Sequence, residues 1–153
     1  MFDVREKPKM VESALLIGVR ISGKTEDNTD NLLIELADLV NTLEIGVMES
    51  MVITIRKPHP HFFIGKGKAY EIMEHCKEQG YDCIVFDDAL TPAQQRNWER
   101  ESKLCVIDRQ EVILDIFANR AQTKEAVLQV GLARMVYSLP RLTRAWTHLS
   151  RQR

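Results

Sequence analysis

The chain has 153 residues, of which 44% are hydrophobic and 28% charged, with a formal net charge of −1, as in a globular domain with one ordinary core. Its apolar runs are too short for a membrane-spanning helix, which takes roughly 20 residues, and its first ten residues lack the apolar segment of a secretion signal. These features exclude a membrane protein and predict a cytoplasmic location.

The first third of the chain has the pattern of strand, helix and strand. Ser13–Ile21 is a continuous apolar run typical of a buried strand, and Gly23 with the polar residues after it indicates a loop. Leucines at helical spacing predict an amphipathic helix over Thr29–Leu43. Val47–Ile55 is a second predicted strand, which Pro58 ends.

A second helix and a third strand follow. Apolar residues recur at helical spacing from Ala69 to Cys76, and Gly80 is expected to end that helix. Cys83–Phe86 is short and wholly apolar, so we expect a strand that is buried on both faces.

The remaining boundaries of this pattern are explicit in the sequence. Thr91 can cap a helix whose first position is a proline, and Gln94 can reach back as in a capping box. Leu104–Ile107 is a fourth predicted strand, and Asp108 begins the next helix. Strand and helix thus alternate four times, which predicts an α/β fold: a four-stranded, mainly parallel sheet flanked by helices on both faces.

Thr123–Leu139 is a further predicted helix with apolar residues on two faces. The second stripe advances by alternating steps of four and three, as in the seam of a coiled coil. Pro140 is expected to kink or end the helix. The alternative is that the sheet domain buries both stripes. The first stripe is Ala126, Val130, Ala133 and Tyr137; the second is Leu128, Leu132, Met135, Leu139, Leu142, Trp146 and Leu149.

The three cysteines, Cys76, Cys83 and Cys105, have no C-x-x-C spacing and lie in apolar strands or on a helix face, so we expect buried thiols. His59 and His61 have no cysteine pair at ligand spacing, and no metal site is predicted.

Gly18, Gly23, Lys24 and Thr25 match the phosphate-binding pattern G-x-x-x-x-G-K-[ST]. In a working loop the strand ends at the first glycine and a helix begins at the lysine. Here strand-like residues continue past Gly18, acidic residues follow Thr25, and the helix starts later. We favour a strand end followed by a turn, with a nucleotide-binding domain as the alternative.

Asp87 and Asp88 follow the third strand, at the end of a parallel sheet where α/β proteins often bind ligands. Asp87 would serve the nucleotide-binding alternative by holding a metal ion. No nearby His, Ser or Cys completes a catalytic site, so a role in capping or fixing a loop is favoured. No catalytic residue is predicted.

The segment Arg56–Lys68 is basic and contains no acidic residue. Phe62 and Phe63 lie among its cations, and basic residues interleaved with aromatics suit RNA phosphates and unstacked bases. A solvated loop whose phenylalanines turn into the core remains equally open. The candidate RNA contacts are Arg56, Lys57, Lys66 and Lys68.

Residues 120–153 hold seven of the 21 basic residues and only one of the 22 acidic residues. An acidic body with a basic tail indicates a polyanionic partner. Arginine suits both phosphate binding and base stacking, so this tail is the stronger RNA candidate, with a disordered chain end as the alternative. Its candidate contacts are Arg141, Arg144, Trp146, His148, Arg151 and Arg153.

Four segments, Ile64–Lys68, Phe86–Glu99, Val106–Val130 and Leu139–Arg153, closely resemble the N-terminal domain of the HflX family. Its members are ribosome-associated GTPases that bind the large ribosomal subunit and split ribosomes, notably under stress. The resemblance implies a small parallel α/β subdomain, then a two-helix antiparallel coiled coil, then a GTPase domain. The loop between the two helices points toward the peptidyl-transferase region of the ribosomal RNA.

On this resemblance, residues 1–120 form the α/β subdomain and residues 121–153 begin the helical one. Thr123–Leu139 matches the first helix and Arg141–Arg153 the start of the loop. The second helix and the GTPase domain, with its GTP and magnesium, are expected outside this chain, which would bind no cofactor and hydrolyse no nucleotide. The implied partners are the large ribosomal subunit, the GTPase domain and the second helix; self-association through the exposed seam is a further possibility.

Overall fold

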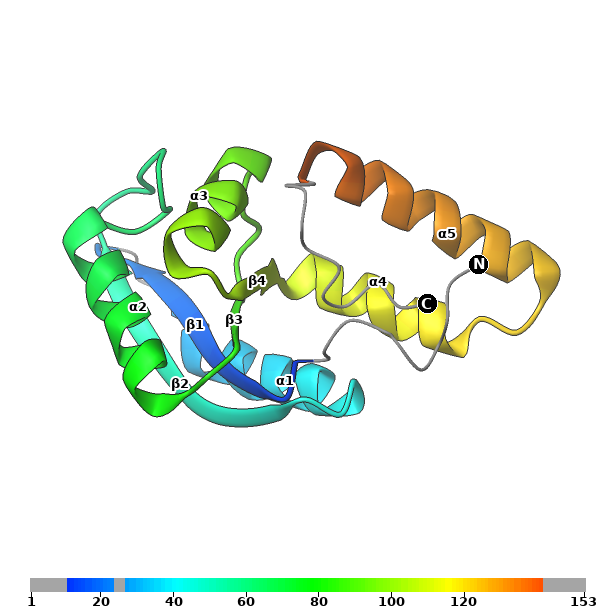
Figure 1. Ribbon diagram of the computed structural model, residues 1–153, viewed down its shortest axis with the longest axis horizontal. Helices are drawn as coiled ribbons and strands as arrows, with labels where there is room; N and C mark the ends of the chain where they lie inside the picture. Colours follow the sequence, from blue (N-terminus) through cyan, green and yellow to red (C-terminus); the bar gives the residue numbers. More distant parts are fainter. Residues whose placement is uncertain (1–10, 24–26, 142–153) are drawn as a thin grey trace.

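The structure of the protein is a computed structural model, and it describes residues 11–23 and 27–141. A twisted sheet with its helices forms one end of the molecule, and helices α4 and α5 extend side by side toward the other (Figure 1). The elements are β1 (Ser13–Ile21), α1 (Thr29–Thr42), β2 (Gly46–Ile55), α2 (Lys66–Gln79), β3 (Cys83–Phe86), α3 (Pro92–Ser102), β4 (Cys105–Asp108), α4 (Arg109–Arg120), α5 (Lys124–Ser138) and a 3-10 turn, η2 (Leu139–Arg141).

The four strands form one sheet in the order β2-β1-β3-β4, and every neighbouring pair is parallel. The predicted parallel sheet is therefore confirmed, and the predicted strand ends lie within one residue of the observed ones. Helix α2 begins at Lys66, three residues before the first apolar residue of its predicted pattern. The pairing of β1 with β2 shifts register after Ala14, so this edge of the sheet carries a bulge near its start.

Each face of the sheet supports its own core, as the alternation of side chains along β1 requires. Leu15 and Ile17 face the core beneath α2 and α3, whereas Ala14 and Leu16 face the core beneath α1 and α4. Helices therefore cover both faces, as predicted. All four residues of β3 are buried, because this central strand has helices above and below it.

Local capping residues explain why the starts of several helices could be predicted from the sequence. Thr91 and Gln94 form the predicted capping box at the start of α3. The Asp108 carboxylate accepts a hydrogen bond from the Glu111 amide at 3.1 Å, and the Thr123 hydroxyl accepts one from the Ala126 amide at 3.0 Å. These bonds satisfy amides that have no partner within the helix.

Two polar contacts join helix α5 to α4 and to the end of β4. Arg134 forms an ion pair with Asp115 of α4 at 2.6 Å, and the Tyr137 hydroxyl donates to Asp108. None of the residues of α5 is fully buried. The first apolar stripe lies partly against α4, whereas Leu128 and Leu132 of the second stripe are 65% and 62% exposed. The described residues therefore leave this seam uncovered.

The buried thiols are also confirmed. Cys83 and Cys105 lie on adjacent strands with their sulfur atoms 3.6 Å apart, and burial raises the pKa of the Cys76 thiol to about 12. Within residues 11–23 and 27–141, no helix is long and apolar enough to cross a membrane, and no three His, Cys, Asp or Glu side chains form a cluster suited to a metal ion.

Gly18 lies inside β1, where helix α1 crosses the strand closely. A Cβ atom at this position would lie 2.8 Å from Cγ2 of Thr29 and 3.0 Å from the side chain of Leu33. The missing side chain is thus what lets α1 pack on the sheet.

We therefore expect Gly18→Ala to destabilise the fold by about 1–3 kcal/mol, the usual result of overpacking a close contact. Thermal and urea unfolding measure the change. Gly131→Ala is the matched control, because a Cβ atom at that helical position meets no atom within 4 Å, so this variant should unfold no earlier than the parent. Equal stability of the Gly18 variant and the parent would refute the packing role.

Candidate nucleic-acid interface

The basic loop, which we define as Arg56–Gly65 between β2 and α2, has a fixed backbone. The amide of His59 donates to the carbonyl of Phe63 at 3.0 Å, and the amide of Phe63 donates back at 2.9 Å. Phe63 takes a left-handed conformation with φ of 71° to close this turn. The loop is thus folded on itself before it meets any partner.

Three side chains of α3 hold the loop from one side. Gln94 donates to the His59 carbonyl at 2.8 Å, Asn97 to the His61 carbonyl at 3.0 Å, and the Trp98 indole to the Phe62 carbonyl at 2.8 Å. Positions 94, 97 and 98 share one face of a helix. Sequence reasoning missed this role of α3; the only available signal was polar and aromatic residues recurring at helical spacing.

The two phenylalanines of the loop do not have the exposure that base stacking requires. Phe62 is fully buried and packs edge-to-face against Trp98, with ring centroids 5.4 Å apart. Phe63 is partly buried and lies 6.4 Å from Phe86. Of the two interpretations that the sequence left open, stacking of Phe62 on RNA bases is therefore wrong, because the core takes that ring.

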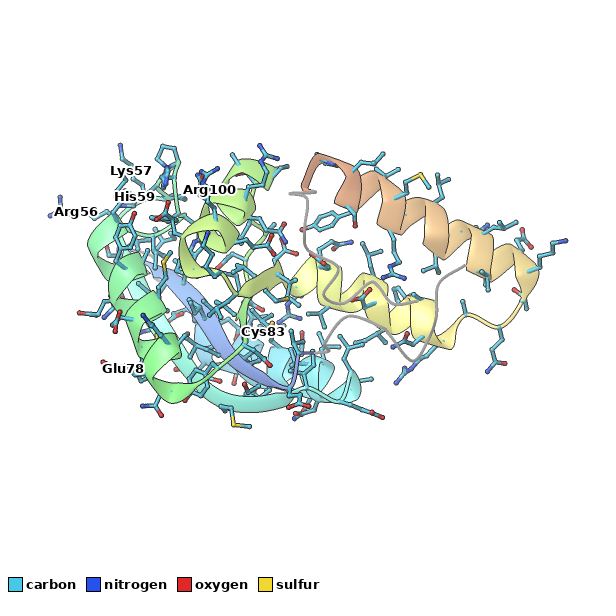
Figure 2. The ribbon with its side chains drawn as sticks, in the orientation of Figure 1. Arg56, Lys57, His59, Glu78, Cys83 and Arg100 are labelled. Atoms are coloured by element: carbon cyan, nitrogen blue, oxygen red, sulfur yellow. The ribbon has the colours of Figure 1, made fainter. Side chains whose placement is uncertain are left out.

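The cations of the basic loop and of the first turn of α2 remain available. Arg56, Lys57 and Lys66 are exposed, and within the described part of the chain no carboxylate pairs with any of them. Lys68 bonds Glu71 at 2.7 Å on the surface, and this bond lowers the pKa of Glu71. Figure 2 shows Arg56, Lys57 and His59 at one end of the molecule with Arg100, a cation that sequence reasoning did not single out.

Two hollows open beside the loop. The first, here called the edge hollow, has a volume of about 600 Å³ and is lined by the end of β2 together with Arg56, Lys57, His59, Gly65 and Lys68. The second, the loop hollow, has a volume of about 360 Å³ and is lined by His59, Pro60, His61, Ile64, Lys66 and Asn97. His59 lines both, so the two hollows adjoin at this residue.

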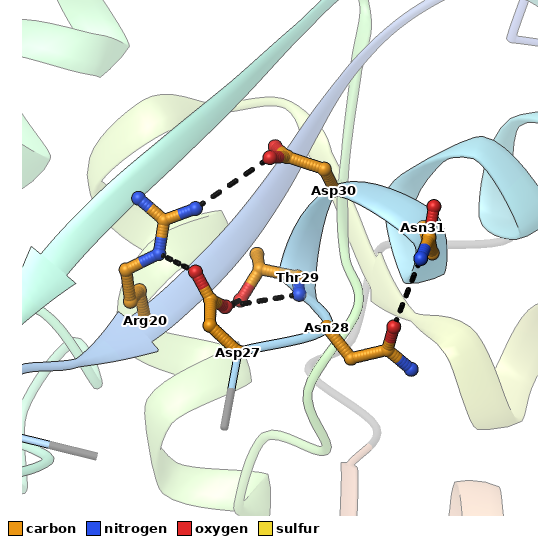
Figure 3. Close-up of polar contacts among 6 residues, drawn as sticks. All are labelled: Arg20, Asp27, Asn28, Thr29, Asp30 and Asn31. Carbon is orange, nitrogen blue, oxygen red and sulfur yellow. Dashed lines mark hydrogen bonds and ion pairs between the residues drawn. The ribbon is translucent and has the colours of Figure 1, made fainter. Parts of the chain in front are cut away.

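The described residues after β1 do not have the geometry of a phosphate-binding loop. β1 continues past Gly18 to Ile21, and Gly23 follows in a turn. The Asp27 carboxylate accepts a hydrogen bond from the Thr29 amide at 3.1 Å and pairs with Arg20 (Figure 3). An aspartate thus occupies the helix terminus where a phosphate would bind. Lys24 and Thr25 lie outside the described residues.

Asp87 has a structural role. Its carboxylate forms an ion pair with Arg109 at 2.6 Å, and Arg109 also pairs with Glu35 at 2.7 Å and donates to the Leu32 carbonyl at 2.9 Å. The loop after β3 is thereby fastened to α1 and α4. This agrees with the favoured loop-fixing role of Asp87.

The predicted contacts of the basic tail fall almost wholly outside the described residues. The backbone of Arg141 ends η2, and Arg96 of α3 donates to the neighbouring Pro140 carbonyl. Helix α3 therefore contacts both the basic loop and the turn that leads into the tail. The predicted RNA contacts that lie outside the described residues are Arg144, Trp146, His148, Arg151 and Arg153.

Comparison with known proteins gives the family. The family model described as "GTP-binding GTPase N-terminal" matches residues 30–118, and that described as "GTP-binding GTPase Middle Region" matches residues 120–153. The GTPase HflX of Akkermansia muciniphila is 52% identical over 152 residues, which cover 99% of this chain. The chain belongs to the HflX family. The GTPase HflX of Escherichia coli is 43% identical over 93% of the chain.

The chain spans about a third of the length of these HflX relatives, 35% and 33% respectively. A crystal structure of a GTP-binding protein from the archaeon Sulfolobus solfataricus, in complex with GDP, shares the fold with a TM-score of 0.63 and 26% identity. That match covers 85% of this chain and 38% of the archaeal one. The α/β fold predicted from the sequence is thus shared with part of a GTP-binding protein.

The hydrogen bond from Trp98 to the loop gives a direct test of how the interface is held. Trp98→Phe should destabilise the protein by about 2 kcal/mol or more, since it leaves the buried Phe62 carbonyl unpaired and opens a cavity. Urea unfolding measures the loss. Tyr70→Phe is the control, because it removes an exposed hydroxyl from another ring that contacts Phe62, and should change stability by less than about 0.5 kcal/mol. Two variants of equal stability would show that the indole bond does not hold the loop.

Proposed function

We propose that this chain is the part of an HflX-type GTPase that docks on the large ribosomal subunit, in a protein that splits or rescues ribosomes under stress. It contacts ribosomal RNA near the peptidyl-transferase region and works in the cytoplasm. GTP hydrolysis, with its magnesium, belongs to a GTPase domain outside these 153 residues, and this chain binds no cofactor of its own.

The observation that carries the proposal is the set of exposed cations on the basic loop and at the start of α2. Arg56, Lys57 and Lys66 have no carboxylate partner among the described residues, so their charge is free to meet a polyanion. The loop is held by hydrogen bonds from α3, so little conformational entropy is lost when RNA binds.

The basic tail supplies the principal contact in this proposal. Arg144, Arg151 and Arg153 bind phosphates, while Trp146 and His148 stack on bases that are not paired. Arg141 continues the same surface. The cation content of residues 120–153 supports this assignment.

The exposed seam of α5 receives the second helix of an antiparallel coiled coil. Its apolar residues are spaced as a coiled-coil seam, and Leu128, Leu132, Met135 and Leu139 are each more than half exposed. A seam of this kind is costly to leave in water. Residues 121–153 then form the start of a helical subdomain joined to the α/β subdomain of residues 1–120.

Co-sedimentation with purified large subunits over a salt series tests the docking function. Arg56→Gln with Lys57→Gln should weaken binding and make the slope of log affinity against log salt shallower by about two, one for each phosphate that is no longer neutralised. Arg144→Gln with Arg151→Gln should do the same. Added ATP should change neither result, since the Gly18–Thr25 segment is assigned no nucleotide.

Lys77→Gln with Lys103→Gln is the control, because it removes the same charge from exposed positions outside both basic segments. Its slope should equal that of the parent. If the two test variants keep the parental slope, the assigned cations do not contact RNA. If ATP binds and Lys24→Ala abolishes that binding, the nucleotide-binding alternative is correct instead.

The seam predicts that this chain associates with itself when no second helix covers it. Sedimentation equilibrium should give a mass that rises with concentration, and Leu132→Gln should reduce the rise. Ile34→Gln on α1, which removes an equally exposed apolar side chain, should leave it unchanged. A monomer mass at every concentration of the parent chain would contradict self-association through α5.

A further inference from the structure

Two glycines at the start of α2 are not explained by the fold. Gly65 caps the helix with φ of −63°, which any residue can adopt, and Gly67 lies in the first turn without a positive φ. A Cβ atom at either position would meet no atom within 4 Å. Glycine destabilises a helix relative to alanine, so these positions lose stability without any gain in packing.

The same turn lies between the two hollows. Gly65 and Lys68 line the edge hollow, whereas Lys66 lines the loop hollow. No side chain of the described residues caps the first amides of α2. Gly67 lies between these two lysines in the first turn of α2, so a ligand that spans both hollows would pass the uncapped backbone of this turn with a lysine on each side.

The lining of the hollows indicates the class of ligand. The edge hollow has an apolar floor from Ile53 and Ile55 and a cationic rim from Arg56 and Lys57. The loop hollow has Ile64 beneath and the rings of His59 and His61 at its side. Apolar floors suit the faces of bases and cationic rims suit phosphates. Both volumes fall in the range of about 300–1,000 Å³ that is usual for small-ligand sites.

We propose that the two hollows hold adjacent nucleotides of an unpaired RNA strand, with His59 between the bases and the linking phosphate against the backbone at Gly65 and Gly67. This rests on the proposed RNA-binding function and adds the class of RNA. In a duplex the bases are stacked and paired inside the helix, so a duplex cannot place the faces of its bases in the two hollows.

Fluorescence anisotropy with a labelled, unstructured oligoribonucleotide of about 12 nucleotides tests the inference, because such a length spans a typical single-strand site. The parent chain should bind the single strand about tenfold more tightly than a duplex of the same length, a difference of one decade in Kd. Gly67→Ala and Gly65→Ser should each weaken single-strand binding about fivefold or more while the duplex is unaffected.

The same two variants should unfold at the parental temperature or about 2–4 °C higher, since alanine favours the helix and serine caps it. A loss of binding in a protein of equal or greater stability separates a ligand contact from misfolding. Gly131→Ala is the control: it removes an equally open helical glycine from α5 and should leave RNA binding unchanged.

Two results would overturn the inference: parental single-strand affinity in both test variants, or equal affinity of the parent for single strand and duplex. If the chain still pellets with large subunits in that case, the docking function stands without these hollows. Single-strand binding that depends on Gly67, in a chain that does not pellet with subunits, would support the hollows and contradict docking on the ribosome.

Discussion

The buried indole of Trp98 is the contact on which the candidate interface depends. Its ring packs against Phe86 at the end of β3 and against Phe62 of the basic loop, at centroid distances of 5.1 and 5.4 Å. Its nitrogen donates to the Phe62 carbonyl, which would otherwise be a buried group without a partner. One side chain thus joins the sheet to the loop, and the backbone that carries the cations of that loop is fixed to the core by this contact.

The elements that sequence reasoning located correctly are those defined by contacts within a few residues. Thr91, Asp108 and Thr123 each accept a hydrogen bond from an amide three residues ahead, so the sequence alone contains both partners. The parallel sheet followed from the alternation of short strands with helices. The bonds from α3 to the loop join residues 35 or 36 positions apart, and nothing local distinguishes Gln94 or Asn97 from surface residues. For the same reason the sequence left the burial of Phe62 open.

The carboxyl ends of the strands show why residue patterns need geometry before they indicate chemistry. Asp87 follows β3, Asp108 ends the adjacent strand β4, and Asp27 follows a motif that matches a phosphate-binding loop. Each of these carboxylates is already engaged by arginine, tyrosine or backbone amides. A carboxylate held in this way fixes a loop or a helix end. Arg56 and Lys57, on the loop after β2, have no carboxylate partner among the described residues, and the proposed anionic partner rests on this difference.

Helix α5 combines directed polar contacts on one side with an uncovered apolar seam on the other. Arg134 and Tyr137 fix its orientation on α4, because ion pairs and hydrogen bonds depend on geometry in a way that apolar contact does not. Burying an exposed leucine is worth about 1.5–3 kcal/mol. The exposed leucines of the seam are therefore the side chains of α5 that can contribute most to the free energy of an association. Arg96 on α3 contacts the turn after α5, and Trp98 on the same helix contacts the basic loop. A partner bound along α5 would therefore meet a surface whose position relative to the basic loop is set by α3.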